Sequence, residues 1–204
     1  MCTPILLSGF FENIWEWLRY ADTQLFLKIN TEWTNPLLDS IYPWYREANA
    51  WVPLYLFLIV FAIMNFKGKA LPWILFAVLT ATLTDQLSSS FIKNLVERPR
   101  PCREELLMGQ VRLILNNCSG GYSFPSSHAT NHFGFAMFLF LTLRPIMKKW
   151  GYVFFIWAAT IAYGQVYVGV HYPLDILAGT LLGCLIGYLT GTYFNKRIGL
   201  PQAA

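Results

Sequence analysis

Residues 174–194 read LDILAGTLLGCLIGYLTGTYF, an apolar stretch in which Asp175 is the single charged residue. An α-helix needs about 20 apolar residues to cross the hydrocarbon core of a bilayer. Glycine stands at every fourth position, at residues 179, 183, 187 and 191, and therefore lines one face of the expected helix. A face of glycines lets another helix approach closely. The stretch predicts a spanning helix packed on a neighbour, with a neighbour in this chain favoured over one in a second copy.

The composition of the whole chain agrees with a membrane protein. Its 204 residues are 55% hydrophobic and 13% charged, and the mean hydropathy is +0.42. An ordinary soluble domain has about 25% charged residues. We predict an all-α fold, a polytopic membrane bundle of five or six spanning helices forming one domain over residues 1–204. The other clear apolar stretches are 51–66, 70–92, 128–143 and 150–168.

The first 48 residues are less apolar than the rest. Phe10, Phe11, Ile14, Trp15 and Leu18 recur at helical spacing, and polar residues occupy the other side. The aromatic-rich residues that follow, 22–44, also carry charges: Asp22, Lys28, Glu32 and Asp39. We interpret residues 1–48 as interfacial helices or a partly embedded hairpin, with an imperfect first span as the alternative, and residues 49–195 as the core.

The positions of the basic residues predict the orientation. Basic clusters follow alternate apolar stretches and therefore fall on one side of the membrane, which the positive-inside rule makes cytoplasmic. The loop 93–127 and the turn 169–173 then face outward. The net charge of +4 comes from scattered residues and not from a stripe, which argues against a nucleic-acid partner. The clusters are Lys67 and Lys69; Arg144, Lys148 and Lys149; Lys196 and Arg197.

The outward loop is itself basic, against the charge bias. A phosphate substrate would explain this, because ionisable residues beside hydrocarbon are costly and commonly functional. Contacts with lipid headgroups are the alternative. The residues concerned are Lys93, Arg98, Arg100, Arg103 and Arg112.

Two histidines at segment ends provide acid–base groups. His171 precedes Asp175 by four residues, so the carboxylate can hold one ring nitrogen and leave the other free to attack phosphorus. His128 follows Ser126 and Ser127 at an expected helix start, where backbone N–H groups favour anions. Lys93 and Arg100 supply the positive charge that a phosphoryl transition state requires.

Three motifs in order carry a resemblance to a known family. Lys93 with Arg100-Pro101, then Pro125-Ser126-Ser127-His128, then residues 167–175 resemble the motifs of the type 2 phosphatidic acid phosphatase family. The resemblance implies a helical membrane bundle that hydrolyses lipid phosphates at its outer interface through a phosphohistidine, with no metal or other cofactor. It makes 93–127 the catalytic loop and 49–195 the phosphatase core.

The resemblance also assigns roles. It implies that His171 is the nucleophile, that Asp175 is its partner, and that His128 is the acid for the leaving group. The phosphate-binding positions that it implies are Lys93, Arg100, Ser126, Ser127 and Gln165.

The chain departs from the family pattern at two places. Ser127 stands where the family has glycine, a change that a backbone N–H donor tolerates. Gly164-Gln165 stands where the third motif begins with serine and arginine, so a phosphate-binding guanidinium is missing. Its loss weakens transition-state binding by a few kcal/mol, unless Arg98 or Arg103 replaces it.

Two of the four cysteines, Cys102 and Cys118, share the outward loop. In an oxidising compartment they are expected to form a disulfide, with two free thiols as the alternative. Their spacing does not match a zinc site, and no further ligand is evident. We predict no metal.

The sequence therefore predicts a lipid phosphatase of the bacterial inner membrane with its active site facing the periplasm. Undecaprenyl diphosphate and the phosphates of lipid A are the first substrates to test, and membrane lipids are the surroundings. The alternatives are a weakened lipid-phosphate-binding protein, a lipid phosphotransferase and a small transporter. A transporter would line a path across the bilayer with its charges, whereas these charges gather at one edge. The oligomeric state is left open.

Overall fold

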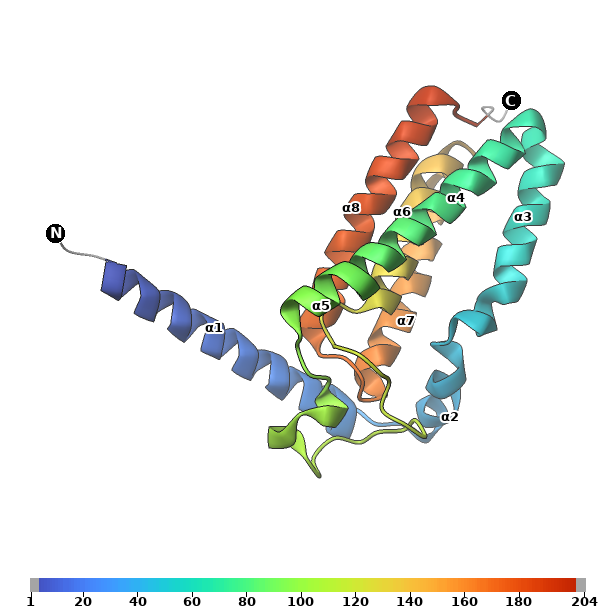
Figure 1. Ribbon diagram of the computed structural model, residues 1–204. Coiled ribbons are helices and arrows are strands. Elements are labelled where there is room, and N and C mark those ends of the chain that lie inside the picture. The colour runs from blue at the N-terminus through green and yellow to red at the C-terminus, as the bar shows by residue number, and fades with distance from the viewer. Residues whose placement is uncertain (1–3, 201–204) are drawn as a thin grey trace.

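The computed structural model describes residues 4–200, with side chains from Glu12 onward. All regular elements in that range are helices, as the sequence predicts (Figure 1). The ends of the expected 1–204 domain, residues 1–3 and 201–204, lie outside the described part of the chain. So do the side chains of Phe10 and Phe11, on which part of the prediction of an interfacial helix rests.

Long helices that run alongside one another form the bundle (Figure 1). Within it, α6 is central and packs against α4, α7 and α8. Two stretches have the length and hydropathy of a membrane span, Ala48–Leu107 and Pro173–Arg197, and the expected total of five or six spans stays a prediction. The bundle helices are α3 (Val52–Phe66), α4 (Ala70–Asp85), α6 (Ser127–Met147), α7 (Val153–Tyr167) and α8 (Pro173–Arg197).

The glycine face of α8 packs against α6 of the same chain, which confirms the favoured interpretation. A Cβ placed on Gly179 would lie 2.6 Å from the carbonyl oxygen of Ser126, and a Cβ on Gly183 or Gly187 would also meet a backbone carbonyl of α6. A Cβ on Gly191 would lie 3.1 Å from the side chain of Leu141. Larger side chains would therefore push α8 away from the start of α6. This close approach fixes the relative position of two helix ends that carry site residues.

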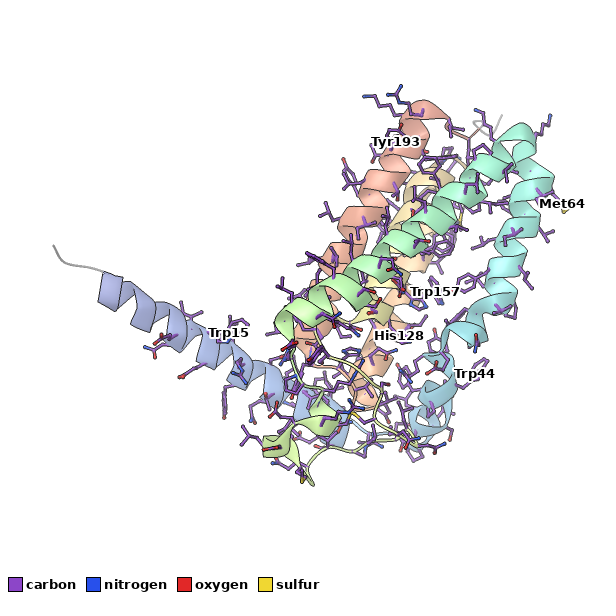
Figure 2. The ribbon with its side chains drawn as sticks, viewed as in Figure 1. Trp15, Trp44, Met64, His128, Trp157 and Tyr193 are labelled. Carbon is purple, nitrogen blue, oxygen red and sulfur yellow. A yellow bond between two sulfur atoms is a disulfide. The ribbon has the colours of Figure 1, made fainter. Side chains whose placement is uncertain are left out.

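Apolar side chains fill the bundle and also cover its outside. Trp73 is buried between helices, and its Nε1 donates to Thr142 Oγ1 over 3.0 Å. On the outer faces, large apolar side chains such as those of Met64 and Tyr193 are exposed (Figure 2). A surface with so many exposed apolar groups suits lipid better than water.

The N-terminal residues form two helices, not one continuous span. Helix α1 (Pro4–Leu27) extends away from the bundle with Trp15 exposed (Figures 1 and 2), and a π-helical turn at Lys28–Glu32 ends it. Helix α2 (Pro36–Tyr45) then begins at an Asn35 cap and lies against α7. Residues 22–44 are therefore not one continuous helix, and both the interfacial interpretation and the imperfect first span stay predictions.

The long loop is held to this N-terminal region and to the bundle. The side-chain amide of Asn30 donates to the carbonyls of Arg112 and Tyr167 over 2.9 and 2.8 Å, and its oxygen accepts the Arg112 N–H. Short elements lie along the loop: a π-helical turn at Gln86–Ile92 that continues α4, helix α5 (Lys93–Val96), and 3-10 turns at Pro101–Arg103 and Glu105–Leu107.

Candidate active site

The expected site residues lie at the end of the bundle where the long loop meets the starts of α6 and α8 (Figure 1). The Ser126 N–H donates to the Asp175 carbonyl over 3.0 Å, which ties the start of α6 to the first turn of α8. The Ser123 N–H donates to the Arg98 carbonyl over 2.8 Å, which ties the two ends of the loop together. Three segments distant in sequence are thereby brought to one place.

His171 lies between a carboxylate and a guanidinium, and its side chain is buried. Nδ1 is 3.4 Å from Asp175 Oδ2, and Nε2 is 3.1 Å from Arg100 Nη1. A guanidinium only donates, so Nε2 is the acceptor and Nδ1 carries the proton that faces Asp175. Burial lowers the pKa of His171 to about 4, although Asp175 acts in the opposite direction. At neutral pH the ring is uncharged, with a lone pair on Nε2.

The sequence around Asp175 explains how its carboxylate is held. Pro173 suits the first turn of α8, and Asp175, two residues later, accepts the backbone N–H of Tyr172 over 2.8 Å. The same carboxylate accepts the Ser123 hydroxyl and Arg98 Nη1, the latter over 2.8 Å. These donors fix the carboxylate in the position from which it orients the imidazole.

Arg100 is buried and held mainly by main-chain carbonyls. Its Nη2, Nε and Nη1 donate to Gly120, Gly121 and Val170 over 3.0, 3.2 and 3.1 Å. Among the described residues, no carboxylate lies within ion-pair distance of this guanidinium. Its charge is therefore not neutralised and can act on an anion beside His171 Nε2.

The disulfide between Cys102 and Cys118 is present, with a Cα–Cα distance of 6.0 Å. It joins the residue that follows Pro101 to the segment just before Gly120. Since the carbonyl of Gly120 accepts from Arg100, the disulfide braces the part of the loop that holds this arginine.

Arg98 and Arg103, the two expected replacements for the missing arginine, are engaged elsewhere. Arg98 bridges two buried carboxylates, with Nη2 2.6 Å from Asp22 and Nη1 2.8 Å from Asp175. Arg103 is exposed, and its Nη2 contacts the Cys118 carbonyl at 3.4 Å. The charge of Arg98 is balanced twice, so it has little to offer a phosphate.

The start of α6 has the features expected of an anion cradle. Ser126 is the N-cap, and its hydroxyl accepts the Ala129 N–H over 3.4 Å. The hydroxyl of Ser127 is buried without a hydrogen-bond partner, and His128 follows in the first turn. Lys93, in α5, is half-buried, and the charges of Arg100 and Asp175 act on its ammonium group.

Gln165 is fully buried in α7 and contacts an arginine that sequence reasoning missed. Its Oε1 accepts from Nε of Arg46 over 3.1 Å. The carbonyl of Gln165 also accepts the backbone N–H of His171 over 3.2 Å. Gln165 therefore connects a second buried guanidinium to the segment that carries the candidate nucleophile.

Asp22, Ser123 and Arg46 were all absent from the predicted site. Asp22 contacts the site through Arg98, and it also accepts the backbone N–H of Leu174 over 2.8 Å. Asp22 and Arg46 are ionisable residues among apolar and aromatic ones. The same feature drew attention to the basic residues of the loop 93–127, and it could have identified these two residues as well. Ser123 has no such signal.

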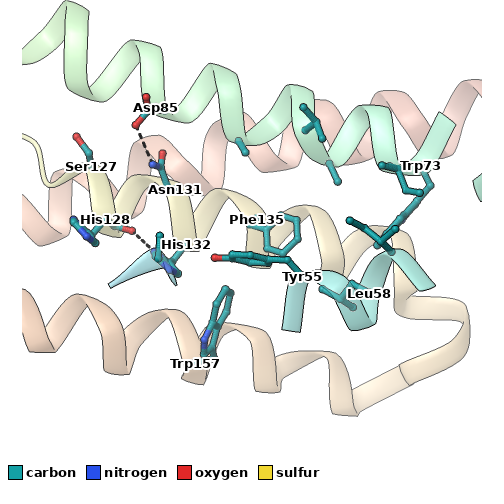
Figure 3. Close-up of a pocket in the computed structure, with 16 residues that line it drawn as sticks. Tyr55, Leu58, Trp73, Asp85, Ser127, His128, Asn131, His132, Phe135 and Trp157 are labelled. Atoms are coloured by element: carbon teal, nitrogen blue, oxygen red, sulfur yellow. Dashed lines mark hydrogen bonds between the residues drawn. The ribbon is translucent and has the colours of Figure 1, made fainter. Parts of the chain in front are cut away.

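A cavity of about 480 Å³ opens beside His128 and extends between the helices (Figure 3). Ser127 and His128 lie at one end, and the apolar side chains of Leu58 and Trp73 lie at the other (Figure 3). A few polar groups are set into its wall near His128, where Asn131 donates to Asp85 over 3.2 Å. The further lining includes Tyr55, Ala77, His132, Phe135 and Trp157. Its shape and apolar walls suit a hydrocarbon chain attached to a group at the site.

Comparison with known proteins gives a consistent picture. A family model described as the PAP2 superfamily matches residues 71–198. The chain is 37% identical over 177 residues to a lipid A 4'-phosphatase of Bacteroides thetaiotaomicron, covering 85% of this chain and 77% of that protein. It is 32% identical over 176 residues to a lipid A 4'-phosphatase of Porphyromonas gingivalis, covering 85% and 72%. The crystal structure of Aquifex aeolicus LpxE has a TM-score of 0.60 and 28% identity, covering 84% of this chain and 94% of that one.

Proposed function

The chain belongs to the PAP2 superfamily and is a membrane lipid phosphatase, and we propose that it removes the 4'-phosphate of lipid A through a phosphohistidine on His171. The observation that carries the proposal is the position of His171 Nε2, 3.1 Å from the unpaired guanidinium of Arg100, with Asp175 behind the ring. The lone pair of Nε2 accepts from Arg100, so a phosphate that draws this guanidinium to itself would meet both the positive charge and the freed lone pair. The substrate is proposed from the relatives, two of which bear this name and align with 85% of the chain.

The proposed reaction has two steps. In the first, His171 Nε2 attacks phosphorus, the bond from phosphorus to the lipid oxygen breaks, and His128 gives that oxygen a proton. In the second, water attacks the phosphohistidine, the phosphorus–nitrogen bond breaks, His128 takes the proton of the water, and inorganic phosphate leaves. Asp175 stabilises the ring when it becomes positive, and Arg100, Lys93 and the start of α6 hold the phosphate oxygens.

The position of the cavity supports the role of His128 as the acid for the lipid leaving group. His128 lies both at the start of α6 and at one end of the cavity, so the leaving oxygen would be on the side of the lipid that occupies the cavity (Figure 3). The phosphate would face His171, and part of the lipid's hydrocarbon chain would lie in the cavity against its apolar walls. A lipid phosphate is favoured over a water-soluble one because the cavity walls are mainly apolar.

We further propose that the site faces the periplasm across the inner membrane. The basic clusters Lys67 with Lys69, and Lys196 with Arg197, lie at the end of the bundle opposite the site (Figure 1), as the positive-inside rule requires of a cytoplasmic end. The disulfide lies at the site end, and disulfides persist in oxidising compartments such as the periplasm. Labelling of single cysteines placed at each end, in intact cells with an impermeant maleimide, tests this orientation.

The test of function is phosphate release by the purified protein in detergent. The panel is lipid A with both phosphates, lipid A with the 1-phosphate alone, undecaprenyl diphosphate and phosphatidic acid. We expect release from the first lipid and none from the second. His171→Ala should abolish release, and Lys148→Ala, at the opposite end of the bundle, should leave it unchanged. With ³²P-labelled lipid A and an alkaline quench, the wild-type protein should carry an acid-labile label.

Each other outcome has a defined meaning. Release by the His171→Ala variant would reject this nucleophile. Faster release from undecaprenyl diphosphate would replace lipid A as the substrate. No release from any lipid by a folded protein would favour the lipid-phosphate-binding alternative, and transfer of the label to an added lipid alcohol in preference to water would favour the phosphotransferase.

A further inference from the structure

Helix α2 ends at Tyr45, and the next residue, Arg46, lies against Gln165 of α7. Arg46 is 5% exposed, although it belongs to the region of the chain that the sequence places at the membrane interface. Its Nε donates to Gln165 Oε1 over 3.1 Å, and its Nη1 donates to Glu47 Oε1 over 2.6 Å. A buried arginine with so few partners needs an explanation, because burying an incompletely paired charge is costly.

The position of Arg46 is defined by the contacts that hold α2 against α7. Asp39 pairs with Arg112 Nη1 over 2.8 Å and accepts the hydroxyl of Tyr167 over 2.6 Å. One turn before Arg46, the ring of Tyr42 packs directly on Gly164. A Cβ at residue 164 would lie 2.6 Å from Tyr42 Cδ1, so the close approach of the two helices depends on glycine. The guanidinium is thus held in a defined place.

The charge of Arg46 is only partly balanced. Glu47, its single carboxylate partner among the described residues, has a side chain that is 49% exposed and therefore well screened by solvent. Nη2 of Arg46 has no hydrogen-bond partner within the described part of the chain. Burial lowers the pKa of Arg46, which means that the fold bears a cost for keeping it charged. A phosphate dianion would offset that cost.

Arg46 is close to the other groups of the site. Its positive charge disfavours the protonated forms of both His128 and Arg100. Gln165 links it to the nucleophile, since the carbonyl of that residue accepts the His171 N–H. Among the described residues, neither the guanidinium of Arg46 nor that of Arg100 pairs with a buried carboxylate, an arrangement that suits a bound anion.

We propose that Arg46 is a second phosphate-binding guanidinium of the site, oriented by Gln165, and that it supplies the positive charge that the resembled family carries as arginine at position 165. Both residues of the Gly164-Gln165 departure from the family pattern then have one cause. Gly164 makes room for Tyr42, and Gln165 accepts a hydrogen bond from the arginine that α2 delivers. This inference rests on the proposed function, because it assigns a ligand for the same phosphate.

The experiment compares Arg46→Gln, Arg46→Lys and the double variant Arg46→Gln/Gln165→Arg with the wild type. Arg144→Gln, an exposed arginine at the far end of the bundle, is the matched control. Phosphate release gives kcat/KM, and inhibition by inorganic orthovanadate gives an affinity for a phosphate-like anion. Thermal unfolding in the same detergent shows whether each variant is folded.

Arg46→Gln should lower kcat/KM by about 100-fold, the usual effect of removing one preorganised donor to a transition state. It should also weaken orthovanadate inhibition by about tenfold or more. Arg46→Lys keeps the positive charge but loses the fork of donors, so its kcat/KM and its orthovanadate affinity should lie between those of the wild type and of Arg46→Gln. If Arg46→Gln does not fold, the result for Arg46→Lys decides whether the inference holds. The double variant moves the guanidinium to position 165 and should recover most of the lost orthovanadate affinity.

The inference is overturned if Arg46→Gln and Arg46→Lys keep wild-type orthovanadate affinity and a kcat/KM within about threefold of the Arg144→Gln control. That result leaves the proposed function intact as long as His171→Ala is inactive. If the folded wild-type protein neither releases phosphate from any lipid nor responds to orthovanadate, the proposed function fails and Arg46 has no phosphate to bind.

Discussion

Alanine at position 164 should reduce activity much more than stability. The change adds one methyl group where Tyr42 packs, and its Cβ would lie 2.6 Å from Cδ1 and 2.9 Å from Cε1 of that ring. Carbon atoms in ordinary contact are about 3.5–4.0 Å apart. Helix α2 or the Tyr42 ring must therefore retreat by about 1 Å, and Arg46 follows four residues after Tyr42.

Two effects on stability oppose each other in this variant. Overpacking of a close helix contact costs about 1–3 kcal/mol. Alanine gains about 1 kcal/mol over glycine inside a helix. The free energy of unfolding should therefore fall by no more than about 2 kcal/mol. Activity has no such compensation, because a displacement of about 1 Å in a positioned group costs up to about 100-fold. We expect kcat/KM to fall by about 10- to 100-fold.

The assay is phosphate release from lipid A beside thermal unfolding in one detergent. Gly68→Ala is the control, because nothing lies within 4 Å of a Cβ at that position. In a Tyr42→Leu background, the same alanine at 164 should cost less than half as much activity, since the ring that it displaces is gone. If Gly164→Ala matches Gly68→Ala in kcat/KM, then α2 does not need this close approach and the argument for a positioned Arg46 loses its basis.

Three further perturbations test other parts of the site. Burial lowers the pKa of His171 to about 4 from about 6.5, so on the acid side kcat/KM should fall only as the pH approaches 4. The stability contributed by the neutral ring is present above about pH 6.5 and is lost as the pH falls from about 6.5 to about 4. An acid limb centred near pH 6.5 in a pH–rate profile would contradict this. Arg98→Gln should lower the free energy of unfolding by about 3 kcal/mol, because it leaves two buried carboxylates without their counter-ion; a change below about 1 kcal/mol in a thermal unfolding experiment would show that the bridge is not structural. Replacing Cys102 and Cys118 by serine should cost about 3 kcal/mol by the same measurement, since the bond joins residues 16 positions apart in the sequence. The wild-type protein in reductant should then match the variant.

The features that were predictable from the sequence are those carried by local patterns. The glycines of residues 174–194 predicted a close helix neighbour, and the structure places α6 there. The motif residues His171, Asp175 and Arg100 stand at segment ends, where the topology of a helical bundle brings them to one edge. Local chemistry also explains Asp175, because a proline and a carboxylate in this order favour the first turn of a helix.

The features that were not predictable depend on contacts between distant segments. Nothing local to Asp22 indicates that it will meet Arg98, 76 residues away, and nothing local to Arg46 indicates Gln165, 119 residues away. Arg98 was a candidate phosphate ligand on charge alone, and only the position of two carboxylates around it shows that its charge is balanced. The sequence does not show how the N-terminal helices pack against the bundle. Without that packing, the charged residues of these helices are interpreted as lying at the membrane interface.

Gln165 changes in meaning once its neighbours are known. Taken alone, an amide in place of a guanidinium indicates a weakened site, which was the main ground for a binding protein without catalysis. A site that had lost its function would have no reason to keep Gly164 open for Tyr42, or to bury Arg46 against the same amide. Retaining a buried cation whose single carboxylate partner among the described residues is half exposed costs free energy, and a bound phosphate would offset that cost. The positive charge has moved from α7 to the end of α2, and the N-terminal region that precedes the matched segment is part of the active site.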